Sequence, residues 1–311
     1  MLQLARNKYF IGFFIIYLIS VLALTLQFNQ PFSDPLSILI CFGIMLPVVS
    51  WLLLKTNEPA ISDRPSFTME PILVTGLVFF FVWYVTYGTA MINKMIPGSL
   101  LAVHWKKEIV IFIKKLLVFV IIPFMLYKVA GFSLKDFGFA PKKNSINRKT
   151  VLLFIILSVL ILLYQYFFSG GARPLRGRMF TTKELITGMP LAFLWLFIVA
   201  GLIEEFFFRA VLQSRITVLL KSPVAGILIS GLIFGLAHAP GLYLRGAESE
   251  GISEQLPFGF FAAYTISAMS LAGIFLGIVW YRTKNIYLVM ALHAMVDLFP
   301  NFDEVVRMWQ I

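Results

Sequence analysis

The sequence predicts an all-α protein, a polytopic transmembrane helical bundle of about eight or nine spans. Hydrophobic residues make up 59% of the chain, charged residues only 13%, and the mean hydropathy is +0.88. These values lie far from those of soluble proteins. The apolar residues occur in continuous runs, whereas the strands of a membrane barrel would alternate apolar and polar residues. At 311 residues the chain is long enough for this number of helices of about twenty residues each.

The apolar runs give the expected order of the helices. Most of them are bounded by charged or proline-containing stretches, such as the Asp-Arg-Pro sequence at 63–65 after the second run. Lys114 and Lys115 interrupt the fourth run and leave only a short apolar part, so we expect this helix to begin on the membrane surface before it enters the membrane. The expected spans are 9–33, 35–54, 71–93, 116–127, 150–172, 185–221, 222–238, 255–281 and 285–300.

The charge of the chain indicates lipid rather than nucleic acid as its partner. The net charge is +11, and the basic residues cluster beside the apolar runs, as they do in cytoplasmic loops that face anionic lipid. Residues 128–149 carry six Lys or Arg against Asp136 alone, which predicts a cytoplasmic loop. We expect N-terminal transmembrane helices of unknown role at 1–130, a basic loop at 131–149 and a core at 150–300. The protein is expected to be a multi-pass integral protein of the cell membrane.

Three ionisable residues lie together inside the sixth apolar run. Glu204, Glu205 and Arg209 follow nineteen uncharged residues, and each ionisable group at mid-membrane costs roughly 2.5–3.5 kcal/mol. Glu205 and Arg209 are four residues apart, so they share a helix face and can pair. Glu204 points about 100° away and remains available for chemistry. The alternative is a purely structural ion pair that holds helices together.

Two histidines and an aspartate lie in the apolar runs that follow. His293 and Asp297 are four residues apart and therefore occupy one helix face. Glu204 lies seventeen residues before the expected turn at 221–222, and His238 lies sixteen residues after it. At 1.5 Å per residue both sit roughly 25 Å from the turn, while His293 and Asp297 lie about 12 and 18 Å deep. We therefore predict that the four side chains converge around one cavity.

These residue types suit two kinds of hydrolytic chemistry. Glu204 can act as a general base for water, with imidazole aiding the tetrahedral intermediate. The same side chains can instead bind a divalent metal such as zinc, with one position left open for water; the candidate ligands are Glu204, His238, His293 and Asp297. The spacing differs from the His-Glu-x-x-His of soluble zinc proteases, and a single cysteine, Cys41, excludes a Cys-rich site.

Functions of other classes are open to the same residues. An intramembrane carboxylate and histidine cluster can form the cation or proton site of a membrane carrier. A non-catalytic membrane scaffold or immunity protein on the same fold is a further alternative. The sequence shows no internal repeat, which argues against a two-fold carrier. The presence of every ionisable residue in the cluster argues against a silent scaffold.

Three motifs, Glu204-Glu205-x-x-x-Arg209, Phe234-x-x-x-His238 and His293-x-x-x-Asp297, follow one another within the apolar runs. In this order they resemble the CAAX protease and bacteriocin-processing (CPBP) family, intramembrane proteases that include the type II CAAX prenyl endopeptidases. The resemblance covers roughly 150–300.

The resemblance implies an intramembrane endopeptidase that cleaves a membrane-associated or lipidated protein or peptide. Glu204 and His238 would activate the water, and Glu205 with Arg209 would hold the geometry of the site. His293 and the residue four positions later would bind or polarise the scissile carbonyl. That later position is often Asn in the family, and here it is Asp297, which when ionised accepts hydrogen bonds but cannot donate one. The family is described both as metalloproteases and as metal-free glutamate proteases, so the resemblance leaves the metal open.

Overall fold

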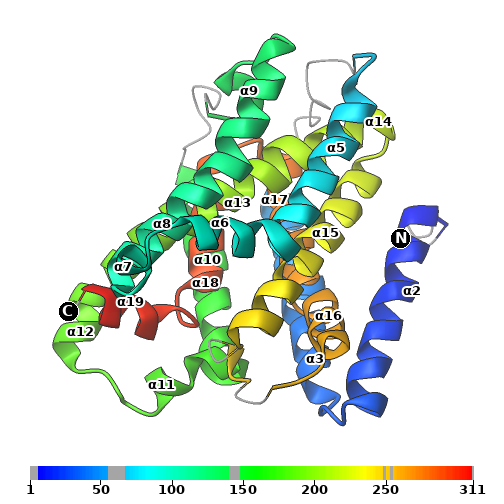
Figure 1. The fold of residues 1–311 in the computed structure, drawn as a ribbon. Coiled ribbons are helices and arrows are strands. Elements are labelled where there is room, and N and C mark those ends of the chain that lie inside the picture. Colours follow the sequence, from blue (N-terminus) through cyan, green and yellow to red (C-terminus); the bar gives the residue numbers. More distant parts are fainter. Residues whose placement is uncertain (1–5, 55–66, 140–147, 248–249, 253–254, 310–311) are drawn as a thin grey trace.

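The computed structural model describes residues 6–54, 67–139, 148–247, 250–252 and 255–309. Within these ranges the chain is helical with no strand beyond one isolated bridge between Ala247 and Ile252. Eight helices are long and apolar enough to cross a membrane. The predicted fold class, an all-α polytopic bundle, is therefore confirmed (Figure 1).

The eight long helices are Lys8–Gln27, Ser33–Leu53, Glu70–Met95, His104–Val129, Arg148–Phe168, Thr182–Leu219, Pro223–Leu244 and Phe258–Thr283. Several of them contain short π-helical stretches, labelled η together with the 3₁₀ turns. The elements before residue 140 are α2 (Lys8–Leu22), η1 (Ala23–Gln27), α3 (Ser33–Ile38), η2 (Leu39–Met45), α4 (Leu46–Leu53), α5 (Glu70–Trp83), η3 (Tyr84–Gly88), α6 (Thr89–Met95), α7 (Gly98–Leu101), α8 (His104–Leu116), η4 (Leu117–Ile121), α9 (Ile122–Val129) and η5 (Leu134–Phe137). The later elements are α10 (Arg148–Phe168), η6 (Gly170–Ala172), α11 (Arg173–Arg176), α12 (Thr182–Leu196), η7 (Phe197–Leu202), α13 (Ile203–Glu205), η8 (Phe206–Gln213), α14 (Ser214–Leu219), α15 (Pro223–Arg245), α16 (Phe258–Ser267), α17 (Met269–Thr283), α18 (Ile286–Asp297) and α19 (Phe302–Trp309).

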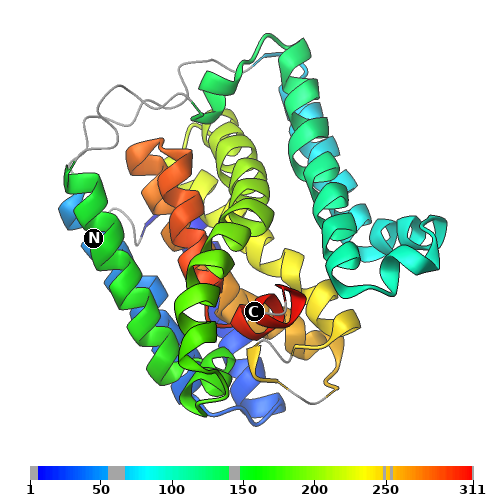
Figure 2. The same ribbon diagram turned by 90° about the vertical axis from the view of Figure 1, so that its left-hand side faces the viewer.

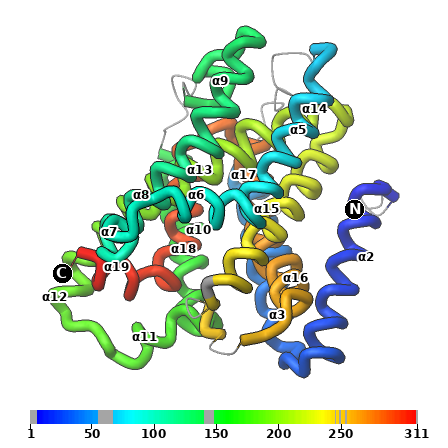
Figure 3. Tube along the Cα trace, in the orientation of Figure 1, coloured from blue at the N-terminus to red at the C-terminus, as the bar shows by residue number. Residues whose placement is uncertain are grey.

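The helices α5 to α9 lie together on one flank of the bundle, as the turned view shows (Figure 2). Aromatic rings attach this flank to the rest of the protein. The ring of Phe81 on α5 lies 5.4 Å from that of Phe119 on η4, and 5.2 Å from that of Phe207 on η8. The trace in Figure 3 places α2 at the right-hand edge of the bundle, where it packs on α15 and α16.

The fourth helix extends well beyond the apolar part expected at 116–127. Residues His104–Val129 form one continuous helix of 26 residues. The two lysines do not interrupt it because each has a partner inside the protein: Lys114 donates to the side chain of Asn93, and Lys115 donates to Glu204. Ionisable groups are tolerated in a span when they face the bundle interior and are paired.

Two further helix ends differ from expectation. The helix that carries His238 continues to Arg245 instead of ending at the histidine. The last apolar run forms only the twelve residues of α18, Ile286–Asp297. At 1.5 Å per residue this helix is about 18 Å long, too short to cross a hydrocarbon core of about 30 Å. Eight of the nine expected runs therefore form helices long enough to span a membrane in the described chain, and the last run does not.

Close backbone contacts hold the central helices together. A Cβ at Gly235 would lie 2.6 Å from the carbonyl oxygen of Thr265, so only glycine allows α15 to approach α16 and α17 this closely. A Cβ at Gly201 would lie 2.7 Å from the carbonyl oxygen of Met290, which brings η7 against α18. Small residues serve the same purpose in other membrane bundles. These contacts fix the relative positions of the helices that carry the four candidate catalytic residues.

The basic loop is described only in part, because 140–147 lie outside the described residues. Its first part packs onto the core: the ring of Phe137 is buried and lies 5.2 Å from that of Phe206 on η8. In the acidic loop after α15, Glu248 and Glu254 lie outside the described residues and Glu250 is described. Cys41 is buried and free, as expected of a packing residue.

Candidate active site

The two adjacent glutamates lie in a short α-helical turn between two π-helical stretches. The turn is α13, and η7 and η8 flank it. Wider π-helical turns are rare and often occur at functional sites, because they shift the direction of the side chains that follow. Here Glu204 lines a cavity, whereas Glu205 faces the packed interior with no exposed surface.

Glu204 lies near both histidines of the predicted site. Its Oε2 lies 3.6 Å from Nε2 of His238 and 3.9 Å from Nε2 of His293. Both distances are longer than a hydrogen bond, and this buried oxygen has no hydrogen-bond partner among the described residues. The other oxygen, Oε1, accepts a hydrogen bond of 3.2 Å from Nζ of Lys115. The predicted convergence of Glu204, His238 and His293 is thus confirmed as geometry.

The orientation of His238 is set within its own helix. Its Nδ1 lies 2.8 Å from the carbonyl oxygen of Phe234, one turn earlier. Because a carbonyl only accepts, Nδ1 carries a proton and donates it. The opposite nitrogen, Nε2, is thereby directed toward Glu204. The spacing of the Phe-x-x-x-His motif therefore places an imidazole at the cavity with a fixed ring orientation.

Glu205 joins Arg209 and His293 in one buried network. Its Oε2 accepts from Nε of Arg209 at 2.8 Å, as the four-residue spacing predicted. Its Oε1 lies 2.6 Å from Nδ1 of His293, a contact between residues 88 positions apart. None of the three side chains is more than 3% exposed. A carboxylate on one ring nitrogen fixes the orientation of an imidazole and favours a proton at that nitrogen.

Asp297 contacts the other edge of the His293 ring. Its Oδ2 lies 3.4 Å from Nε2 of His293, and its side chain is 29% exposed. The same Nε2 faces Oε2 of Glu204 at 3.9 Å. All four candidate catalytic residues line one cavity, whereas the supporting residues Glu205 and Arg209 do not.

Residues 186–299 match the family model described as Rce1-like, type II CAAX prenyl endopeptidase Rce1-like. We call this segment Rce1-like, because it is similar to that family. The match contains all three motifs and confirms the recognition based on them. No curated protein and no solved structure matches the chain.

Together with the eight long apolar helices of the described residues, the match shows an integral multi-pass membrane protein whose residues 186–299 are similar to type II CAAX prenyl endopeptidases. The Rce1-like segment begins after α10, so the helices of 1–130 lie outside it.

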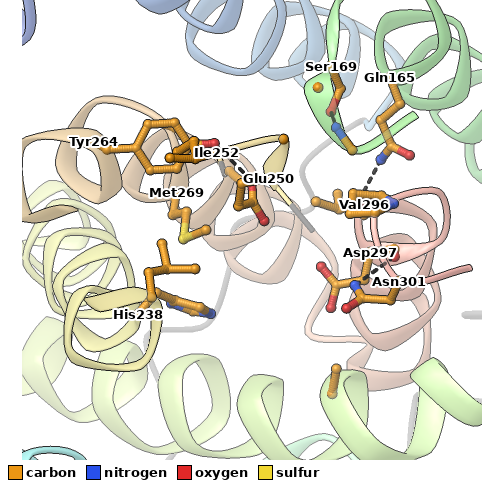
Figure 4. A pocket seen from close by; sticks show the side chains of 18 of the residues that line it. Gln165, Ser169, His238, Glu250, Ile252, Tyr264, Met269, Val296, Asp297 and Asn301 are labelled. Atoms are coloured by element: carbon orange, nitrogen blue, oxygen red, sulfur yellow. Dashed lines mark hydrogen bonds between the residues drawn. The ribbon is translucent and has the colours of Figure 1, made fainter. Parts of the chain in front are cut away.

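The cavity beside the Rce1-like motifs has a volume of about 1170 Å³, larger than most pockets for small ligands. Figure 4 shows His238, Glu250 and Asp297 around this space. Glu250 lies in the loop after α15, where its Oε2 accepts a hydrogen bond of 2.8 Å from Tyr264. Burial raises the pKa of Glu250 above its usual range, the hydrogen bond from Tyr264 lowers it, and the charge of Asp297 raises it further. The cavity is thus large and lined in part by ionisable side chains, which suits a peptide segment better than a small apolar ligand.

Among the residues that the structure describes, no group of three or more His, Cys, Asp or Glu side chains is placed to hold a metal ion. In addition, Glu204 already has the ammonium group of Lys115 on one oxygen. A divalent ion at the other oxygen would be close to this positive charge, which disfavours its binding.

Sequence reasoning missed two residues of this site. Lys115 was treated as an interruption of an apolar run, although an ionisable residue inside such a run is itself a sign of a functional or paired group. Glu250 lies in a loop whose other glutamates gave it no distinguishing pattern. Its contact with Tyr264 depends on how the loop folds back over α16, which the sequence does not reveal.

Proposed function

We propose that the chain is an intramembrane endopeptidase that hydrolyses a peptide bond of a membrane-associated or lipidated protein, with water activated by Glu204 and His238. The observation that carries the proposal is Oε2 of Glu204, which has no hydrogen-bond partner among the described residues and faces the Nε2 atoms of both histidines in the cavity. Buried polar atoms without a partner are rare in proteins and call for an explanation. A water molecule held for reaction supplies one.

Glu204 and His238 would act together on this water. Nδ1 of His238 donates to the carbonyl of Phe234, so in the neutral ring Nε2 is free to accept a hydrogen bond. Oε2 of Glu204 takes a proton from the water, and the oxygen of that water attacks the scissile carbonyl carbon. The proton then passes to the leaving amine as the C–N bond breaks, and Glu204 is again a carboxylate.

His293 would stabilise the oxyanion that forms in this attack. Its Nδ1 is held by Glu205 and its Nε2 faces the cavity beside Asp297. Carboxylates on both sides stabilise the doubly protonated ring, which donates from Nε2 to the developing negative charge. Asp297 lies at the other edge of this ring and helps to orient it, since it cannot itself donate to the oxyanion.

The substrate class rests on the family description and on the cavity. The matching model is that of a prenyl endopeptidase, and the wide cavity among membrane helices suits a peptide that reaches the site from the lipid. We assign the catalytic role to the core at 150–300. Zinc held by the candidate ligands is the alternative to a metal-free site.

The test is cleavage of a library of candidate substrates, prenylated peptides included, by the purified protein. The Glu204→Gln variant keeps the shape of the side chain and removes the base, so its turnover should be lost. Glu184→Gln is the matched control, because Glu184 lies on the same long helix, caps its beginning and does not line the cavity. Equal cleavage by wild type and Glu204→Gln would contradict the proposal.

A further inference from the structure

Lys115 reaches the candidate active site from outside the Rce1-like segment. It lies on α8, and its Nζ is 3.2 Å from Oε1 of Glu204. Its side chain is 31% exposed and lines the same cavity, while that of Glu204 is 11% exposed. The preceding residue, Lys114, is bonded to Asn93 of α6. The two lysines thus fix the position of α8 between the flanking helices and Glu204.

The contact divides the two oxygens of Glu204 between different partners. Oε1 is held by the ammonium group, and Oε2 is left facing the Nε2 atoms of His238 and His293. A carboxylate can rotate about its last bond, and a charged hydrogen bond to one oxygen restricts that rotation. Lys115 therefore decides which oxygen faces the cavity.

The charges of the site balance only when Lys115 is counted. Glu205 is paired with Arg209, and Asp297 lies against His293. Among the described residues, Lys115 is the only lysine or arginine in salt-bridge contact with Glu204. An ionised carboxylate without a counter-ion is unfavourable among membrane helices.

We propose that Lys115 is a positioning residue: it is the counter-ion of Glu204, which keeps this carboxylate ionised and directs Oε2 toward the two histidines. The inference rests on the proposed function of Glu204 as the base. It gives the helices of 1–130 a role, because one of them completes the site. Lys115 also supplies the positive charge that a bound metal ion would otherwise bring to Glu204.

The test combines activity with a stability cycle. Lys115→Met removes the charge, Lys115→Gln keeps a hydrogen-bond donor without charge, and Lys115→Arg keeps the charge. The matched control is Lys106→Met, since Lys106 lies on the same helix, does not line the cavity and has no ion pair within the described chain. Lys115→Met and Lys115→Gln should lower kcat roughly 10–100-fold, as is typical for residues that orient a reacting group, with little change in KM. Lys115→Arg should restore most of the rate, and Lys106→Met should leave it unchanged.

The stability cycle does not depend on peptidase activity. Lys115→Met should lower Tm in the wild-type background, because it leaves Glu204 without its counter-ion. In the Glu204→Gln background the same change should have little effect, so the two changes are not additive. Additive changes in Tm, or an unchanged kcat in both Lys115→Met and Lys115→Gln, would overturn the inference. If the changes in Tm are non-additive but the protein cleaves none of the tested substrates, the result would support the ion pair and overturn the proposed function.

Discussion

Glu204 and Glu205 are neighbours in the chain, yet their surroundings differ completely. Glu204 faces a cavity and keeps one oxygen free. Both oxygens of Glu205 are engaged, one by Arg209 and one by His293, and the side chain is fully buried. The first arrangement suits a reacting group and the second suits a support, which is the division of roles that we propose.

This division predicts different costs for the two alanine substitutions. Glu205→Ala leaves the buried guanidinium of Arg209 without its ion pair, at about 3–5 kcal/mol. Glu204→Ala leaves only Lys115, which is 31% exposed and can turn to water, so its cost should be clearly smaller. Thermal unfolding of the detergent-purified variants measures both. Equal losses of Tm in the two alanine variants would show that Glu205 supports the fold no more than Glu204 does.

Asp297 is the residue that separates a metal-free site from a metal site. If no metal takes part, Asp297→Asn keeps an oxygen that can orient His293 and adds a group that donates to the oxyanion, so activity should be preserved or improved. If a metal is bound, Asp297 ligates it or orients His293, and the substitution should cost roughly 10–100-fold. The measurement is peptidase activity of wild type and Asp297→Asn after chelation and after zinc is returned. We expect activity to survive chelation; full loss with recovery on zinc would contradict this.

Glu250 should make stability depend on pH in a direction set by its burial. Burial raises the pKa of Glu250 in the folded protein, and the charge of Asp297 adds to this, against the hydrogen bond from Tyr264. The neutral acid is therefore favoured, and stability is lost as the pH rises above the ordinary carboxyl pKa of about 4.3 and the buried group ionises. Glu250→Gln removes the ionisation. Its Tm relative to wild type should rise with pH, and a difference that is constant from pH 4 to 8 would count against the buried, ionising carboxyl.

At the scale of elements, the contact between η7 and α18 holds the two halves of the site in register. Gly201 touches the backbone of Met290, three residues before His293. Helices can approach this closely only where side chains are absent. The distance between His293 and the two glutamates on α13 therefore depends on this glycine.

Gly201→Ala should damage activity through this contact. The new Cβ would lie 2.7 Å from a carbonyl oxygen of the backbone, which cannot move without shifting α18. We expect a loss of stability of about 1–3 kcal/mol, typical of overpacking, and a fall in kcat larger than that of a surface change. Gly76→Ala on α5 is the control, because a Cβ there meets nothing within 4 Å. Comparable activity in the two variants would show that the helices can separate without affecting the site.

The sequence predicted those parts of the fold and site that depend on local spacing. Apolar runs gave the spanning helices, the four-residue spacing gave the Glu205–Arg209 pair, and equal distances from one turn placed Glu204 level with His238. It failed where a residue depends on a distant partner. The lysines of α8 find theirs 21 and 89 positions away, so a count of charges in the run could not show that the helix continues.

At the scale of the whole molecule, a buried ion pair joins the N-terminal helices to the Rce1-like segment. Glu70 at the beginning of α5 pairs with Arg215 on α14, and both side chains are at most 1% exposed. The guanidinium also lies 5.1 Å from the ring of Phe132, so it is enclosed by groups from both regions. Since α8 stands on the same flank as α5 and carries Lys115, this pair supports the site indirectly (Figure 2).

Breaking this pair on one side should therefore harm both stability and activity. Glu70→Leu leaves the buried charge of Arg215 without its carboxylate, at about 3–5 kcal/mol, whereas the double variant Glu70→Leu/Arg215→Met removes both charges and should recover most of the loss. Activity should follow the same order, because the flank that carries Lys115 is loosened in the single variant and packed again in the double one.

The control for this pair is Asp303→Asn on α19, which breaks the exposed pair of Asp303 with Arg307, 39% and 75% exposed. Such pairs contribute at most about 1 kcal/mol, so its Tm should stay close to wild type. Thermal unfolding and substrate cleavage of the four proteins measure the effect. A double variant as unstable as Glu70→Leu would show that the pair itself, rather than the removal of an uncompensated charge, is what joins the N-terminal helices to the core.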